Sequence, residues 1–220
     1  MYPVRGSKRA GRAGPPSHAW WLLSLLSAVM AGGCLFVGPA PPEQVNIRPL
    51  PPRLPTYTVS GQAIIAAPGP ISVTVQPVGP EEVHGYFRSR PPRVNPFQGM
   101  QKAITPFLVR IENRTRDQVT FDPGLAVLKD QDNRPATAWD AMDLHQTFGE
   151  KPALLQAAQG GVFTGYLVVP PDQSREGLLI FPALPKDAKA LLLHFSSLYA
   201  GPAPYPLIFE FTVVPEESKK

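Results

Sequence analysis

Apolar and polar residues alternate with a period of two along much of the chain after residue 56, and this pattern predicts β-strands. The clearest case is residues 104–112, where Phe107, Val109 and Ile111 fall on one face. Turn-forming residues separate such runs at about eight- to ten-residue spacing, which is typical of an antiparallel β-sandwich. The other predicted strands are residues 57–66, 71–75, 118–121, 125–129, 136–139, 162–169, 177–181, 190–195 and 207–214.

Two stretches depart from this alternation. Residues 140–149 and 152–159 are rich in Ala, Leu, Gln and Met, and two glycines follow them, which predicts one or two short helices inserted into the sandwich. Residues 77–103 have no regular period and contain five prolines, which predicts a long connection. Its arginines either bind an anionic glycan or lipid head group or belong to a solvated loop; they are Arg88, Arg90 and Arg93.

The segment before the predicted strands is rich in proline. Residues 35–55 contain seven prolines, and such segments favour an extended, semi-rigid conformation. This composition predicts a tether, with a PxxP-type ligand as the alternative. The predicted division of the chain is therefore 1–33 as a signal peptide, 34–55 as the tether, 56–215 as the β-sandwich and 216–220 as a polar tail.

The first 33 residues have the pattern of a secretory signal. Residues 1–18 carry four basic side chains and no acidic one, and residues 20–30 form an apolar run interrupted by two serines. Small residues follow, immediately before Cys34. The run is too short to cross a hydrocarbon core, which needs about 20 residues.

The segment Met30-Ala31-Gly32-Gly33-Cys34 resembles the lipobox of bacterial lipoproteins, although Ala31 stands where leucine is usual. The resemblance implies cleavage between Gly33 and Cys34 and lipidation of the Cys34 thiol. Leu35 then favours the outer membrane, because aspartate at that position is the family's signal for inner-membrane retention. Two alternatives remain: an uncleaved signal anchor over residues 19–37, and an ordinary cleaved signal with a free thiol.

Residues 104–214 resemble the immunoglobulin-like domains of unknown function that occur in bacterial surface lipoproteins. The resemblance rests on residues 107–113, on residues 125–130, and on residues 165–172 together with 177–181. It covers about half of the chain and implies no catalytic residue. The predicted fold class is thus all-β, an Ig-like antiparallel sandwich with a short helical insertion.

Charge and cysteine content exclude several functions. The formal net charge of +4 arises in the signal, since 17 basic and 17 acidic residues follow from Cys34 onward, so nothing favours a nucleic-acid partner. A single cysteine allows no disulfide framework.

We predict no metal and no cofactor: the histidines lack ligand spacing, and residues 130–133 are read as an Asp/Asn-rich turn in preference to a calcium loop. The glycosylation triplet at Asn113 is likewise read as a turn.

These features together predict a lipid-anchored cell-envelope lipoprotein that is not an enzyme. Its expected partners are the membrane, through the lipid, and another envelope protein or a glycan. The alternatives are an accessory or sensor subunit of an exported machine and a hydrolase. No serine lies in a nucleophile elbow and no phosphate-binding loop is present in the sequence.

Overall fold

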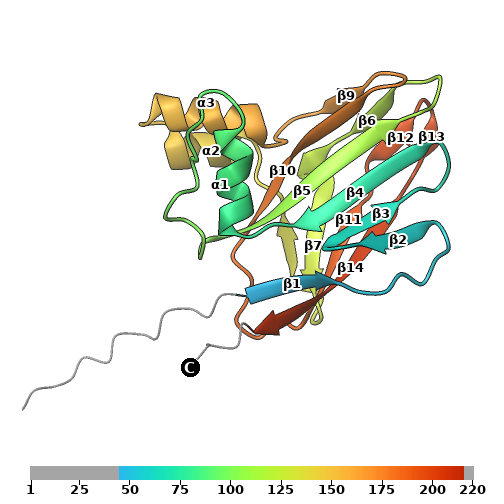
Figure 1. The fold of residues 1–220 in the computed structure, drawn as a ribbon, viewed down its shortest axis with the longest axis horizontal. Coiled ribbons are helices and arrows are strands. Elements are labelled where there is room, and N and C mark those ends of the chain that lie inside the picture. The colour runs from blue at the N-terminus through green and yellow to red at the C-terminus, as the bar shows by residue number, and fades with distance from the viewer. Residues whose placement is uncertain (1–44, 216–220) are drawn as a thin grey trace, which may run out of the picture. The chain divides into compact units, whose positions relative to one another are not determined.

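The structure is a computed structural model that describes residues 45–215 (Figure 1). Residues 1–44, which include the predicted signal, Gly33 and Cys34, lie outside the described part, as do residues 216–220. The fold is an antiparallel β-sandwich with a helical insertion, as the alternation predicts.

Two five-stranded sheets pack face to face. The first sheet has the order β1 (Val45–Pro49), β14 (Leu207–Pro215), β11 (Ala190–Phe195), β7 (Ala126–Asp130) and β8 (Pro135–Thr137). The second has the order β10 (Ser174–Pro182), β5 (Ile104–Asn113), β4 (Ile71–Pro77), β3 (Ala63–Ala66) and β2 (Tyr57–Ser60). Each neighbouring pair is antiparallel.

A four-stranded sheet extends the first one. Its order is β13 (Ala203–Pro204), β12 (Leu198–Ala200), β6 (Val119–Phe121) and β9 (Leu167–Val169). Strands β6 and β7 are separated by a short 3-10 turn, Pro123–Leu125, and β11 and β12 by two serines. The Ser197 hydroxyl bridges this break, since it donates to the Asp122 carbonyl at 2.8 Å and accepts the Asp122 N–H at 3.2 Å.

The residues predicted to face inward do form the core between the sheets. Phe107, Val109 and Ile111 are fully buried, and so are the inward positions of β6, β11 and most of β14. The Phe107 ring lies 5.9 Å from that of Phe181 and 5.3 Å from that of Phe211, so it joins the two sheets. Burial of apolar area of this kind is the main stabilising contribution to such a fold.

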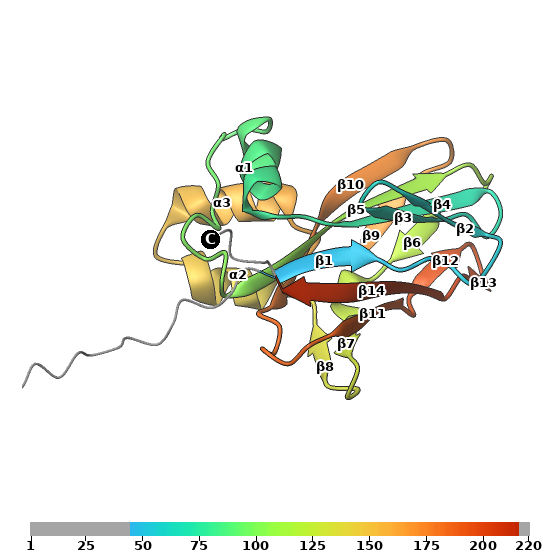
Figure 2. The ribbon, with the colours of Figure 1, turned by 60° about the horizontal axis from the view of Figure 1, so that its bottom comes forward.

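The helices gather beside β10 and β5 of the second sheet (Figure 2), and a second core lies between them and the outer face of that sheet. Strand β10 contains the continuous apolar run Leu178–Phe181 because both of its faces are buried. Leu178 and Ile180 contact the helical layer. The helices are α1 (Pro80–Arg88), α2 (Ala141–Phe148) and α3 (Pro152–Gly161), and the last two confirm the predicted insertion.

Helix α1 lies where the sequence predicted an irregular connection over residues 77–103. It begins with a proline and two acidic residues, and the Glu82 carboxylate accepts the Gly79 N–H at 2.8 Å. Val83 and Phe87, four residues apart, are its buried residues. A single pair of apolar residues with helical spacing is too short a pattern to predict a helix in a segment that contains five prolines.

Three further differences concern strands. Strand β1 lies within the segment predicted as tether, because Ile47 packs against the core while β1 pairs with β14. The single strand predicted over residues 57–66 is a hairpin, since Gly61 takes a left-handed φ of 61° at the turn. The strand predicted over residues 162–169 is reduced to an isolated bridge at Val162 and to β9.

Candidate functional site

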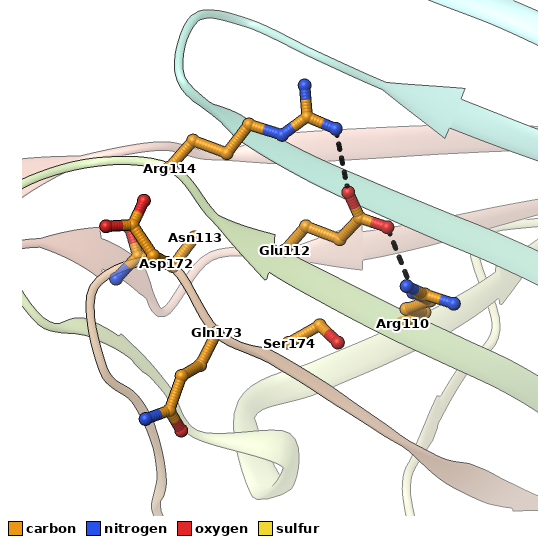
Figure 3. A pocket seen from close by; sticks show the side chains of 7 residues that line it. All are labelled: Arg110, Glu112, Asn113, Arg114, Asp172, Gln173 and Ser174. Atoms are coloured by element: carbon orange, nitrogen blue, oxygen red, sulfur yellow. Dashed lines mark hydrogen bonds and ion pairs between the residues drawn. The ribbon is translucent and has the colours of Figure 1, made fainter.

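A polar hollow of about 360 Å³ lies where β5 ends and β10 begins (Figure 3). The residues that line it come from β5 and its following turn and from the turn between β9 and β10. They are Arg110, Glu112, Asn113, Arg114, Asp172, Gln173 and Ser174. The antiparallel pairing of Ser174 with Glu112 brings these two distant segments together.

The charged groups in this hollow pair with one another. The Glu112 carboxylate forms an ion pair with Arg110, whose Nε lies 3.0 Å away, and accepts a hydrogen bond from Arg114 Nη2 at 3.2 Å, as Figure 3 shows. The arginine side chains are 48% and 73% exposed, so solvent screens both ion pairs and each contributes little to stability.

Asn113 is buried beneath the hollow and its side chain is fully bonded. Its amide nitrogen donates to the carbonyls of Asp117 and Val169, both at 2.8 Å. Its amide oxygen accepts from the Thr115 N–H at 2.8 Å and from the Thr115 hydroxyl at 2.7 Å. Asn113 therefore links the turn after β5 to β9. Both hydrogens of its side-chain amide are bonded within the folded domain, so neither is free to react with a glycosylating enzyme.

The turn between β7 and β8 holds an arginine among three carboxylates. Arg134 pairs with Asp130, with Asp187 at 2.9 Å and with Asp132 at 3.3 Å. The positive charge that balances these aspartates is therefore supplied by Arg134 of the same chain. Within the described residues, no group of three or more His, Cys, Asp or Glu side chains is arranged to hold a metal ion.

This arrangement lowers the pKa of two carboxyl groups. Burial alone would raise the pKa of Asp130, but hydrogen bonds from the Arg134 N–H, the Arg134 guanidinium and the Asp132 N–H outweigh it and lower the pKa below its ordinary 3.8. The hydrogen bond from Arg134 chiefly lowers the pKa of Asp187. A carboxyl with a lowered pKa stabilises the fold above its unfolded-state pKa, and this contribution is lost as the pH falls through the folded-state value.

We therefore expect Arg134→Met to reduce the free energy of unfolding at pH 7 and the difference from wild type to shrink as the pH falls below about 3.8. Urea unfolding at a series of pH values from 7 to about 2.5 measures both effects. Arg53→Met is the control, because Arg53 is 85% exposed and lies 3.8 Å from Glu210. A deficit in Arg134→Met that stays constant with pH would contradict this account.

The three arginines of the predicted connection have different environments. Arg90 donates to Glu176 of β10 at 2.7 Å, and its guanidinium carbon lies 3.7 Å from the centre of the Tyr86 ring. Arg88 ends α1, and Arg93 takes a left-handed φ of 64° in an exposed turn. Neither forms an ion pair with a carboxylate in the described part of the chain, and none of the three lines the polar hollow.

The sequence pattern does not indicate the residues of the hollow as a site. Alternation with Val109 and Ile111 places Arg110 and Glu112 on the outward face of the strand, and nothing in the sequence relates them to residues 172–174. None of the helices within residues 45–215 is both long enough and apolar enough to span a bilayer.

No protein-family model matches the chain, and no curated protein matches it. Two solved structures resemble it. The yjhA protein from Bacillus subtilis is 14% identical over 44% of this chain, with a TM-score of 0.30, and the match spans 58% of the length of that protein. A FixG-related protein from Vibrio parahaemolyticus is 10% identical over 67% of this chain and 98% of its own, with a TM-score of 0.37. At these values neither resemblance assigns a function.

Proposed function

We propose that the protein is a lipid-anchored lipoprotein of the bacterial cell envelope whose β-sandwich has a binding or structural role without catalysis. The observation that carries the proposal is the single cysteine of the chain, which follows a basic segment, an apolar run and the small residues Ala31, Gly32 and Gly33. The cysteine thiol is the nucleophile in lipid transfer, so no other residue type serves at this position.

The distance from Cys34 to the folded domain limits how far the domain extends from the membrane. Strand β1 begins at Val45, which leaves ten residues, 35–44, between the cysteine and the sandwich (44 − 34 = 10). At about 3.1 Å per residue in an extended proline-rich conformation, ten residues span roughly 30 Å. The proposed anchor thus keeps the sandwich close to the membrane surface.

The polar hollow supports a role without catalysis. A nucleophile needs a base within hydrogen-bond reach, and the base needs a group that orients it. The charged side chains of Glu112, Arg110 and Arg114 are instead occupied with one another, and Asn113 has no free donor. Binding through exposed loops and sheet edges requires no such constellation.

The test is expression in a Gram-negative host with a labelled fatty acid. Wild type is expected to carry the label and to fractionate with membranes, because two or more acyl chains anchor a protein stably. Cys34→Ser is expected to carry no label and to keep its first 33 residues. Ala31→Leu, which supplies the usual lipobox leucine, is the control and should be labelled at least as well as wild type. Persistent labelling of Cys34→Ser would refute the proposal.

A further inference from the structure

The outer face of the first sheet keeps large apolar side chains in contact with solvent, whereas the helices pack against the second sheet. Ile208 of β14 is 50% exposed and Leu192 of β11 is 38% exposed. Val127 of β7 points the same way, because its neighbours Ala126 and Leu128 are buried in the core. Apolar side chains that gather on one surface and are rimmed by polar ones mark an interaction site.

Strand pairing arranges this face in rows that run across the strands. The central strand of the five is β11, with β14 on one side of it and β7 on the other. In one row, Leu192 lies between Glu210 of β14 and Lys129 of β7. Neighbouring strands are about 4.8 Å apart, so a carboxylate and an ammonium group flank Leu192 at equal backbone distances on opposite sides.

This row is complementary to a second copy of itself. If two such faces meet about a two-fold axis directed along β11, Leu192 lies against the partner's Leu192 and Glu210 against the partner's Lys129. A two-fold axis directed across the strands would instead oppose like charges, which is unfavourable. Within residues 45–215, Lys129 forms no ion pair, and Glu210 has only the exposed Arg53 at 3.8 Å.

The next row fits the same axis. There His194 lies between Ile208 and Val127, so the axis along β11 places Ile208 against the partner's Val127. Apolar side chains then meet on both sides of the axis. The two sheets would stack face to face at about 10 Å, as the sheets of a sandwich do.

The position of the tether selects this axis independently of charge. Strand β1 begins at Val45, which pairs with Pro215 at the end of β14, and ten residues separate Val45 from Cys34. Rotation about an axis along the strands keeps Val45 of both copies at the same end of the pair, so both tethers can reach one membrane. Rotation about an axis across the strands would place the two tethers at opposite ends.

We infer that two copies of the chain in the same membrane associate through the outer face of the first sheet, with Glu210 of each copy against the partner's Lys129. This inference rests on the proposed lipid anchor and names a second copy as the binding partner. The face is five strands wide and six residues long at β11. At standard strand spacings it covers roughly 500 Å², less than the roughly 800 Å² per partner of a stable soluble dimer. Confinement to a membrane raises the effective concentration of the copies and so favours a weak interface.

The test is Förster transfer between lipidated copies that carry a donor or an acceptor at the C-terminus, in phosphatidylcholine vesicles at a fixed, low ratio of protein to lipid. Wild type is expected to show more transfer than random mixing gives. Lys129→Glu and Glu210→Lys are each expected to lower the association constant about tenfold, because each sets like charges against one another twice in the pair. The double variant Lys129→Glu/Glu210→Lys restores opposite charges and is expected to associate as wild type does.

Two variants away from this face are the controls. Lys151→Glu reverses the charge of an exposed lysine between α2 and α3 and should leave transfer unchanged. Leu192→Asp should reduce transfer to the random level, whereas Met142→Asp, at a residue of α2 that is 63% exposed, should not. Urea unfolding of each variant verifies that it folds.

Random transfer in wild type, or transfer that Leu192→Asp does not reduce, would overturn the inference. A double variant that associates as weakly as the single ones would overturn the pairing of Glu210 with the partner's Lys129. Random transfer in wild type together with a lower free energy of unfolding in Leu192→Asp would show that another segment of the same chain covers the face. Sedimentation with the vesicles reports on the anchor separately, so failure of the pairing is distinguishable from failure of the proposed lipidation.

Discussion

Asn113→Asp is expected to lower the free energy of unfolding by about 3 kcal/mol, because two buried hydrogen bonds are replaced by contacts between oxygen atoms. In the wild-type protein the amide nitrogen donates to the carbonyls of Asp117 and Val169. The substituted carboxyl has nearly the same shape, but it offers no second donor and, when ionised, faces two carbonyl oxygens. Burying a charge without a partner adds to the cost.

Urea unfolding at pH 7 measures this loss. Asn46→Asp is the matched control, since Asn46 is exposed on the edge strand β1 and surface substitutions usually change stability by about 0.5 kcal/mol or less. If both variants lowered the free energy of unfolding by the same amount, the hydrogen bonds of Asn113 to Asp117 and Val169 would not stabilise the fold as described.

Phe107→Ala is expected to lower the free energy of unfolding by about 3–5 kcal/mol. The Phe107 ring is fully buried and lies against Phe181 of the same sheet and Phe211 of the opposite one. Truncation removes these contacts and leaves a cavity that the two sheets close only in part. Thermal and urea unfolding measure the loss.

Phe97→Ala provides the comparison for the helical layer. The Phe97 ring packs within 5.6 Å of Phe148 and 5.8 Å of Phe87, so its loss should be of similar size if the layer is a core in its own right. Tyr166→Ala, at a residue 68% exposed, is the control and should have little effect. A small loss in Phe107→Ala would show that the sheets are not held together at this ring.

Local alternation was enough to predict most strands, because each of them buries one face. The inward set of β5, the apolar positions of β11 and the final strand β14 follow directly from a period of two. The two helices after residue 140 also follow from local composition. Asp140 caps the first of them, because its carboxylate accepts the Met142 and Asp143 N–H groups.

What the sequence did not predict depends on partners far along the chain. Strand β1 has few apolar residues and exists because β14 pairs with it. Helix α1 has one apolar pair, Val83 and Phe87, and the surface that it covers comes from α3, Phe97 and β10. The polar hollow joins residues 110–114 to residues 172–174, so its lining could not be predicted from local spacing.

The most direct test of the anchored-lipoprotein proposal is the intact mass of the mature protein purified from native envelope membranes. The account predicts an N-terminus at Cys34 and a mass equal to residues 34–220 plus acyl groups carried by that residue. An N-terminus at any other residue, with no acyl adduct, would contradict it.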